Sequence, residues 1–242
     1  MPNNSLVFVL FDSERKSVLD WRKRFNIIDG IAQGLLYLHK YSRLRVIHRD
    51  LKASNILLDD DMNPKISDFS MARILCLSES EANTKRVVGT YGYMAPEYAM
   101  HGVVSTKIDV FSLGVLLLEI VSGRKNNGFY HPEEPITLIG YAWQLWKEGQ
   151  GLQLLDQTLG DCNTHNVLRC IHIGLLCVQD QPTDRPTMSD VVAMLSNETL
   201  ELPDPKQPAF FASAVVEEID GLELNDQNCS RNTVTITVMQ AR

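Results

Sequence analysis

The sequence predicts a mainly α-helical fold with a few short β strands. Several long segments carry apolar side chains at helical spacing, which indicates amphipathic or buried helices. Much shorter apolar runs, typical of strands, surround polar loops in the first third of the chain. Clusters of Gly, Pro and Asn separate these segments. With 242 residues and no internal repeat, the chain can form one large domain or two small ones with a sizeable core.

The first predicted helix covers residues 18–40. Its apolar residues recur every three or four positions, so they form one stripe along the helix. Asp20 precedes this stripe and is expected to be the N-cap, because its carboxylate can accept hydrogen bonds from free backbone N–H groups. The stripe consists of Trp21, Phe25, Ile28, Ala32, Leu35 and Leu38.

Three short apolar runs follow, with the sequences RVIH (45–48), NILLD (55–59) and PKIS (64–67), and each is expected to be a strand. The first two flank the polar loop HRDLKASN (48–55). Residues 71–93 show no period, and they include charged residues, small polar residues and two glycines. They are predicted to form a long surface loop, and loops of that length tend to be functional or disordered.

The second half of the chain is predicted to be helical. Residues 108–121 (IDVFSLGVLLLEIV) are apolar nearly all round, so they should form a central buried helix. Further helices are expected at 138–148, 165–178 and 188–196. After residue 200 the sequence becomes rich in proline and then acidic, which predicts a flexible extension that docks through its last apolar alternation, VTITV.

Composition excludes several classes of protein. A net charge of −7 without a clustered basic surface argues against nucleic-acid binding. The five cysteines form no CxxC pair, which favours a reduced, intracellular protein. Cys170 and Cys177 share a helical face, and buried thiols are a better interpretation of them than a metal site. The apolar run at 6–11 is far short of the ~20 residues of a membrane span, so we expect no membrane segment and a cytoplasmic location.

Three motifs occur in a fixed order: HRDLKASN (48–55), SDF (67–69) and GTYGYMAPE (89–97). Together they match the signature set of protein kinases in order and spacing, although each alone would be weak. The chain resembles a plant receptor-like serine/threonine protein kinase of the S-domain (G-type lectin) subfamily. The segments DVFSLGVLLLEIVSGRK and DRPTMSDVVAML extend the resemblance, as do PKQPAFF and VTITVMQAR in the tail.

The resemblance implies the large, C-terminal lobe of a protein kinase. Residues 1–17 would be a hinge remnant and the start of that lobe, and residues 18–199 its body. The body would hold a catalytic loop at 48–55 and an activation segment at 68–97, and 200–242 would be a flexible tail. The implied function is ATP-dependent phosphoryl transfer to serine or threonine of proteins in receptor signalling. The parent family is anchored in the plasma membrane, with this domain on the cytoplasmic side.

The resemblance also assigns catalytic roles. Asp50 would accept or orient the proton of the substrate hydroxyl, and Lys52 would place a cation at the transferred phosphoryl group. Thr90 would hydrogen-bond both of them. Asn55 and Asp68 would be Mg²⁺ ligands, because that ion prefers hard oxygen ligands. Positioning and charge neutralisation of this kind supply most of the catalysis of phosphoryl transfer. Leu57 would form the floor under the adenine ring of ATP.

Other residues would support the site without reacting. Arg49 would bind a phosphate on the activation segment, since a phosphate brings about −1.5 to −2 charge. The acceptor candidates are Thr84, Ser80 and Ser78. The predicted structural residues are His48, which packs and bonds to the backbone; Arg49; Asp109, which caps the catalytic loop; and the buried ion pair of Glu97 and Arg185.

Two departures from the family pattern affect the expected activity. The 47 residues before His48 leave no room for the small lobe, and residues 1–17 contain no glycine for a Gly-rich loop. We therefore expect weak or absent binding of ATP and Mg²⁺. We also expect the chain to be inactive alone. Alternatives are a non-catalytic, pseudokinase-like interaction module that binds a full-length kinase, or a gene-model fragment. Position 70 is Ser where the family has Gly, which costs about 1 kcal/mol if a left-handed residue is needed there.

Overall fold

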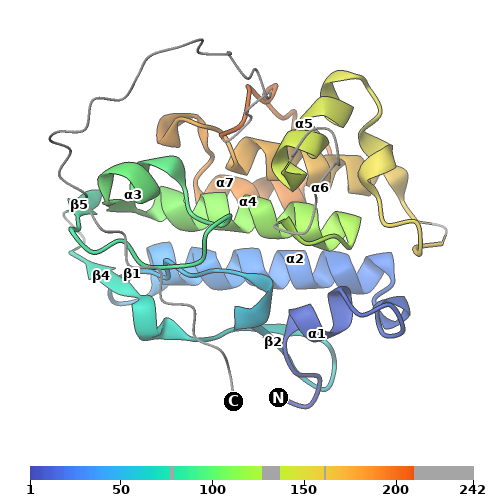
Figure 1. Ribbon diagram of the computed structural model, residues 1–242, viewed down its shortest axis with the longest axis horizontal. Helices are drawn as coiled ribbons and strands as arrows, with labels where there is room; N and C mark the ends of the chain where they lie inside the picture. Colours follow the sequence, from blue (N-terminus) through green and yellow to red (C-terminus); the bar gives the residue numbers. More distant parts are fainter. Residues whose placement is uncertain (77–78, 127–136, 161, 210–242) are drawn as a thin grey trace, which may run out of the picture.

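The computed structural model describes residues 1–76, 79–126, 137–160 and 162–209, and it confirms the predicted mainly helical fold with short strands (Figure 1). The helices are α1 (Leu6–Leu10), α2 (Trp21–Leu36), α3 (Pro96–His101), α4 (Thr106–Ser122), α5 (Leu138–Lys147), α6 (Thr164–Cys177) and α7 (Met188–Ser196). The strands are β1 (Arg45–Ile47), β2 (Ile56–Leu58), β3 (Pro64–Ile66), β4 (Arg73–Leu75), β5 (Glu81–Asn83) and β6 (Val103–Ser105).

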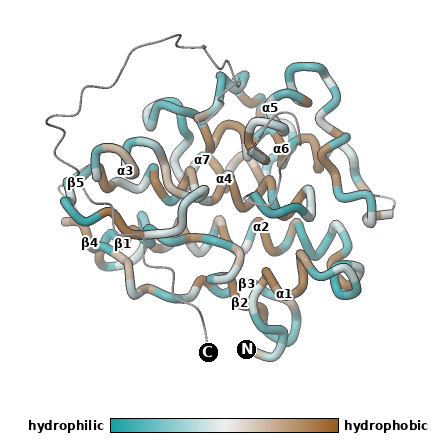
Figure 2. Tube along the Cα trace, viewed as in Figure 1, coloured by the Kyte–Doolittle hydropathy of each residue, from teal (hydrophilic) through white to brown (hydrophobic). Residues whose placement is uncertain are grey.

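Helix α4 is the centre of the core, as its apolar sequence predicted. Every residue from 108 to 122 is buried, and the helix lies between α2 on one side and α6 on the other (Figures 1 and 2). Gly114 allows the close approach of α6, because a Cβ atom there would lie only 2.6 Å from Cβ of Cys177 and 2.8 Å from the carbonyl oxygen of Gly174. Cys170 and Cys177 are both buried, and burial raises the pKa of each thiol to about 12.

Helix α2 begins at Trp21 rather than at the predicted residue 18. Asp20 is its N-cap and accepts a hydrogen bond from the backbone N–H of Lys23 at 2.9 Å, which stops the helix from starting earlier. Residues Lys16–Val18 form a separate 3₁₀ turn. At its other end the helix continues into a wider π turn over Tyr37–Tyr41, so this end lies close to the predicted end at residue 40.

The strands form three two-stranded antiparallel sheets within the described residues: β1 with β4, β2 with β3, and β5 with β6. The three predicted strands are β1, β2 and β3. The prediction of a strandless loop at 71–93 is wrong, because β4 and β5 lie inside it. Each pairs with a strand far away in the sequence, and such short pairings rest on backbone hydrogen bonds that leave no periodic pattern. Two short helices, α1 and α3, were also not predicted.

Residues 200–209, the start of the predicted tail, lie on the helical body. Pro203 accepts a hydrogen bond through its carbonyl oxygen from Nε2 of His172, at 2.7 Å. Gln179 exchanges two hydrogen bonds with the backbone of Lys206, and the N–H of Ala209 donates to the carbonyl oxygen of Val178. The rest of the tail, including VTITV, lies outside the described residues. Nowhere in the described ranges does a helix have the length and apolar character needed to cross a bilayer.

Candidate active site

The HRD sequence lies directly after β1 and is fixed by helix α4. The carboxylate of Asp109, fully buried in the first turn of α4, accepts hydrogen bonds from the backbone N–H groups of His48 at 2.8 Å and Arg49 at 2.9 Å. Nε2 of His39, in the π turn after α2, lies 2.9 Å from the same carboxylate. Arg49 has a positive φ of 67°, a strained conformation for a long side chain. The bonds to Asp109 hold the loop in that shape.

Three side chains meet at Asp50, which is 3% exposed. One carboxylate oxygen, Oδ1, accepts a hydrogen bond from Oγ1 of Thr90 at 2.7 Å. The other, Oδ2, lies 2.9 Å from Nζ of Lys52. Nζ of Lys52 also donates to Oγ1 of Thr90 at 2.7 Å, and Nδ2 of Asn55 donates to the carbonyl and carboxylate oxygens of Asp50. The structure thus brings together the four residues that sequence analysis named as catalytic.

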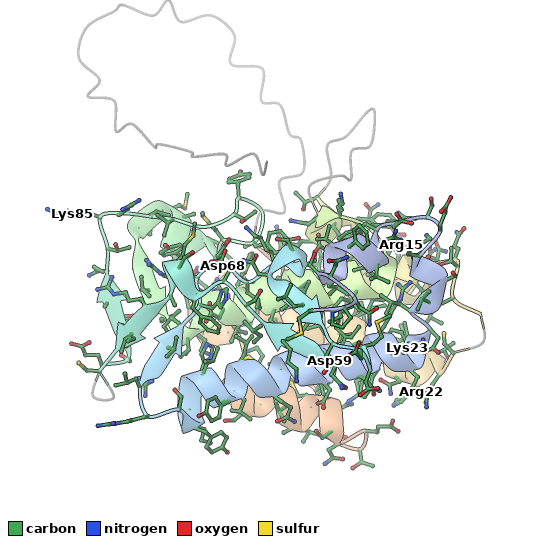
Figure 3. All side chains as sticks on the ribbon, turned by 90° about the horizontal axis from the view of Figure 1, so that it is seen from below. Arg15, Arg22, Lys23, Asp59, Asp68 and Lys85 are labelled. Carbon is green, nitrogen blue, oxygen red and sulfur yellow. The ribbon has the colours of Figure 1, made fainter. Side chains whose placement is uncertain are left out.

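Asp68 lies at the bend after β3, on the face of the molecule shown in Figure 3. Its backbone is left-handed, with φ 62° and ψ 70°, and aspartate is one of the few residues that tolerate this region. Ser67, just before it, accepts a hydrogen bond from Nε2 of His48 through its carbonyl oxygen, at 2.9 Å. The ring of Phe69, just after it, packs edge-on against the ring of His48 at 5.0 Å.

The condition for strain at Ser70, a left-handed backbone at that residue, is not met. Residues Phe69–Met71 form a 3₁₀ turn, and the left-handed residue in this stretch is Asp68. Ser70 therefore pays no left-handed penalty here. Its hydroxyl and its backbone N–H both donate to Oδ1 of Asp68, and these hydrogen bonds lower the pKa of the Asp68 carboxyl below its usual value.

Asn55 and Asp68 are the residues that could hold Mg²⁺. The Asn55 amide nitrogen donates to the carbonyl and carboxylate oxygens of Asp50, and the amide oxygen accepts a long hydrogen bond of 3.4 Å from Oγ of Ser54. Ser67 donates two hydrogen bonds to the carbonyl oxygen of Asn55, so the two segments are joined. No group of three or more His, Cys, Asp or Glu side chains suited to a metal exists among the described residues. A two-oxygen set of this kind fits Mg²⁺, which commonly keeps waters and phosphate oxygens as its other ligands.

Leu57 lies in the middle of β2, between the buried residues Ile56 and Leu58, and is itself only half-buried. Because side chains alternate along a strand, Leu57 points to the opposite, more open face. Ser5 forms a bridge with Leu57, and the N–H of Leu58 donates to the carbonyl oxygen of Asn4. The first residues of the chain thus run beside the strand that carries Leu57.

Residues 68–97, the predicted activation segment, contact both Arg49 and helix α3. Arg49 donates from Nε to the carbonyl oxygen of Met71 at 2.6 Å and from Nη1 to the hydroxyl of Tyr98 at 3.4 Å. Thr84 is half-buried, and its backbone N–H donates to the carbonyl oxygen of Gly102 at the end of α3. Ser80 is exposed, and the third candidate, Ser78, lies outside the described residues.

Glu97 and Arg185 form a bidentate ion pair, with nitrogen–oxygen distances of 2.7 and 2.9 Å. Arg185 is 1% exposed and also donates to the carbonyl oxygens of Gln179, Asp180 and Lys107. This single guanidinium joins the start of α3, the start of α4 and the segment before α7. The pair holds the end of the predicted activation segment against the helices.

A buried polar cluster that was not predicted from the sequence lies beside Gly92 and Tyr93. Glu119, in the last turn of α4, accepts hydrogen bonds from the hydroxyl of Tyr93 at 2.7 Å and the backbone N–H of Asn126 at 2.8 Å. The Asn126 amide in turn donates to the carbonyl oxygen of Gly92. Burial raises the pKa of Glu119 to about 7, and burial together with Glu119 raises the pKa of Tyr93. A lone glutamate inside an otherwise apolar helix was the available signal.

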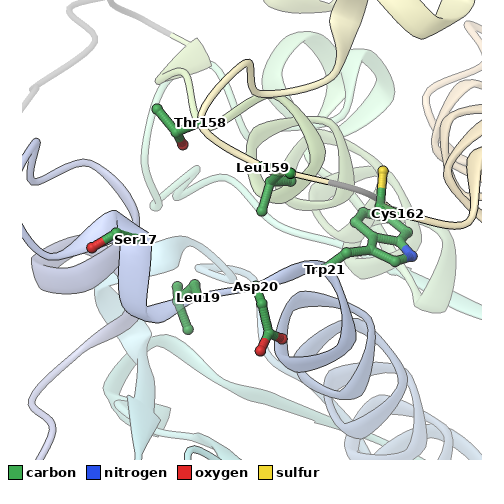
Figure 4. A pocket seen from close by; sticks show the side chains of 8 residues that line it. Ser17, Leu19, Asp20, Trp21, Thr158, Leu159 and Cys162 are labelled. Carbon is green, nitrogen blue, oxygen red and sulfur yellow. The ribbon is translucent and has the colours of Figure 1, made fainter.

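A small hollow of about 130 Å³ lies elsewhere, between the start of α2 and residues 158–160 and 162 (Figure 4). Trp21 and Cys162 line it together with Leu19, Asp20 and Leu159. None of the residues named above as catalytic or cofactor-binding contributes to its wall, so it is separate from the Asp50 site.

The sequence matches the protein kinase domain family over residues 1–195 and a domain of unknown function over residues 197–242. It is 56% identical over its full length to a G-type lectin S-receptor-like serine/threonine-protein kinase of Arabidopsis thaliana, of which it covers 29%. It is 55% identical over its full length to the receptor-like serine/threonine-protein kinase SD1-7 of the same plant, of which it covers 30%. Cysteine-rich receptor-like protein kinase 10, also from Arabidopsis thaliana, is 58% identical over 87% of this chain, which covers 32% of that protein.

These matches confirm the resemblance to receptor-like serine/threonine kinases, and the chain spans about 30% of the length of the relatives named here. The match to the protein kinase domain covers most of the chain. The chain therefore belongs to the protein kinase family, with receptor-like serine/threonine kinases among its relatives.

Proposed function

We propose that these residues form the large-lobe part of a protein kinase that transfers the γ-phosphoryl group of ATP to serine or threonine hydroxyls of proteins. The observation that carries the proposal is the hydrogen-bonded triangle of Asp50, Lys52 and Thr90. A carboxylate, an ammonium group and a hydroxyl at these distances are what an in-line displacement needs on the side of the attacking hydroxyl.

In this proposal Asp50 accepts the proton of the incoming hydroxyl. Thr90 fixes Oδ1 of Asp50, so that the carboxylate cannot rotate away from the substrate. The ammonium group of Lys52, held by Thr90 and Asp50, stabilises negative charge on the transferred phosphoryl group. Asn55 holds the other side of Asp50 through its amide nitrogen. Mg²⁺ held by Asn55 and Asp68 would neutralise phosphate charge when bound.

Nucleotide binding by this chain alone is proposed to be weak. The 242 residues contain no G-x-G-x-x-G sequence, so the loop that covers the phosphates in protein kinases would have to come from outside them. The described residues would supply the floor at Leu57 and the metal ligands. Without a cover the site is open to water, and electrostatic interactions with phosphates weaken in water.

The resemblance to receptor-like kinases supports two further parts of the proposal. The substrates would be proteins with exposed serine or threonine residues, and the domain would work on the cytoplasmic side of the plasma membrane. A second kinase chain could be a partner that supplies or receives a phosphate.

Calorimetric titration with ATP, with and without Mg²⁺, tests the site directly. We expect weak binding that Mg²⁺ strengthens, and loss of the Mg²⁺ effect in Asp68→Asn. Ser196→Ala is a suitable control, since its hydroxyl only bonds to the carbonyl oxygen of Val192 on α7. Equal ATP binding by the native chain and Asp68→Asn, with and without Mg²⁺, would rule the metal site out.

A further inference from the structure

Ser70 makes a contact with Asp68 that a glycine at this position could not make. Its side-chain hydroxyl donates a hydrogen bond to Oδ1 of Asp68 at 2.6 Å. Its backbone N–H donates to the same oxygen at 3.3 Å. Glycine would offer the backbone donor alone, so the hydroxyl supplies the shorter of the two hydrogen bonds.

The backbone around this contact leaves the Asp68 carboxylate little choice of direction. Asp68 is in the left-handed region and is the N-cap of the 3₁₀ turn Phe69–Met71, and its side chain accepts a hydrogen bond from the backbone N–H of Ser70 in that turn. Both donors of Ser70 reach Oδ1 and not Oδ2. The carboxylate is therefore held by one oxygen, and the second oxygen is turned away from the 3₁₀ turn.

Because Asp68 lies at the surface, the orientation of its carboxylate depends mainly on the hydrogen bonds from Ser70. Asp68, Phe69 and Ser70 are all exposed, so tight packing does not fix the carboxylate. The ammonium group of Lys52 is bound to Thr90 and Asp50. In an exposed position, hydrogen bonds to the ligand are the main means of orienting it.

We propose that Ser70 is a positioning residue for a divalent cation: its hydroxyl holds Oδ1 of Asp68 and thereby presents Oδ2 as the metal-binding oxygen. This inference rests on the proposed function, which makes Asp68 a Mg²⁺ ligand. Hydrogen-bond partners of a metal ligand orient it, and removing one typically weakens metal binding by roughly 10- to 100-fold. Because this hydrogen bond is exposed, we expect the lower end, about tenfold.

Titration of the 242-residue chain with Mn²⁺, followed by paramagnetic broadening of assigned backbone amide signals, tests the inference. Mn²⁺ prefers oxygen ligands as Mg²⁺ does, and broadening detects even weak binding. Ser70→Ala removes only the hydroxyl, and Ser70→Thr keeps it. We expect Ser70→Ala to need about tenfold more Mn²⁺ for half-maximal broadening around Asp68, and Ser70→Thr to stay within about twofold of the native chain.

The variant Asp68→Asn distinguishes the claim that Asp68 is a metal ligand from the claim that Ser70 positions it. If Asp68→Asn abolishes the broadening while Ser70→Ala leaves it unchanged or strengthens it, Asp68 is a ligand and the role of Ser70 is wrong. If the broadening around Asp68 is absent in the native chain, or persists in Asp68→Asn, the metal site itself is wrong and the inference falls with it. Ser196→Ala, an exposed serine on α7, should match the native chain throughout.

Discussion

Oγ1 of Thr90 lies 2.7 Å from Oδ1 of Asp50, although 40 residues separate them in the sequence. The same hydroxyl accepts a hydrogen bond from Lys52 at 2.7 Å. A hydroxyl has one proton to donate and lone pairs to accept, so Thr90 can make both contacts at once. It therefore joins the end of the predicted activation segment to the predicted catalytic loop, and the shape of one depends on the shape of the other.

Replacing Thr90 by valine should remove this connection while keeping the side-chain volume. In a chain that joins these 242 residues to the small lobe of a receptor-like relative, we expect Thr90→Val to lower kcat by about 100-fold, because Asp50 and Lys52 lose their shared partner. Thr90→Ser keeps the hydroxyl and should retain most of the activity. Steady-state assays on a peptide substrate measure both. An unchanged kcat in Thr90→Val would contradict the role given to the hydroxyl.

Glu119 should make stability depend on pH. Burial raises its pKa from 4.5 to about 7 in the folded chain, so the folded state holds a proton that the unfolded state releases between these values. The stabilisation is complete below pH 4.5 and is lost as the pH rises to about 7. Glu119→Gln removes this titration, so its stability relative to the native chain should rise by about 3 kcal/mol across that window. Urea unfolding at several pH values measures the difference, and a constant difference would contradict the account.

Replacing one partner of the buried ion pair between Glu97 and Arg185 should strongly lower the free energy of unfolding. Arg185→Met leaves the Glu97 carboxylate and three carbonyl oxygens without their partner, so we expect a loss of about 3–5 kcal/mol in the free energy of unfolding. Lys206→Met is the control, since the Lys206 ammonium pairs with Asp184 at the surface and should matter by about 1 kcal/mol or less. Equal losses in the two variants would show that the burial of Arg185 has no special effect.

Gln179 should anchor residues 200–209 to α6. Its side chain is 2% exposed, and it both donates to and accepts from the backbone of Lys206. Gln179→Ala leaves these backbone groups unpaired, so we expect about 1–3 kcal/mol of destabilisation and faster proteolysis within 200–209. The exposed Gln181, whose amide bonds only to the neighbouring Asp180, provides the control variant Gln181→Ala. Equal proteolysis rates in both variants would show that the anchor lies elsewhere.

The long helices could be predicted from the sequence, because burial of one face imposes a period that is visible in the residues. Helix α7 was predicted at 188–196 and is observed at Met188–Ser196. Strands β4, β5 and β6 were not predicted, although they are no shorter than β1, β2 and β3. Strands β4 and β5 lie in a stretch that shows no period, and each of the three missed strands pairs with a partner that is distant in the sequence. Helix α3 had local signals, Pro96 at its start and Gly102 in the left-handed region at its end, that sequence analysis did not use.

The candidate site, too, could be predicted only in part from the sequence. The residue types at Asp50, Lys52, Asn55 and Asp68 could be named from motifs, since phosphoryl transfer needs that chemistry. The effect of Ser70 could not, because it depends on which residue of the bend has a positive φ, and that residue is Asp68. The Glu119 cluster depends on a contact between α4 and Tyr93 that only the folded chain creates.

The central claim is that Asp50 serves the transfer of a phosphoryl group to a hydroxyl. Its most direct test is a single-turnover assay with radiolabelled ATP and a serine-containing peptide, in the chain joined to a relative's small lobe. Asp50→Asn should lower the rate of transfer by about 100-fold or more while ATP binding stays within about twofold. Transfer at the native rate by Asp50→Asn would contradict the account.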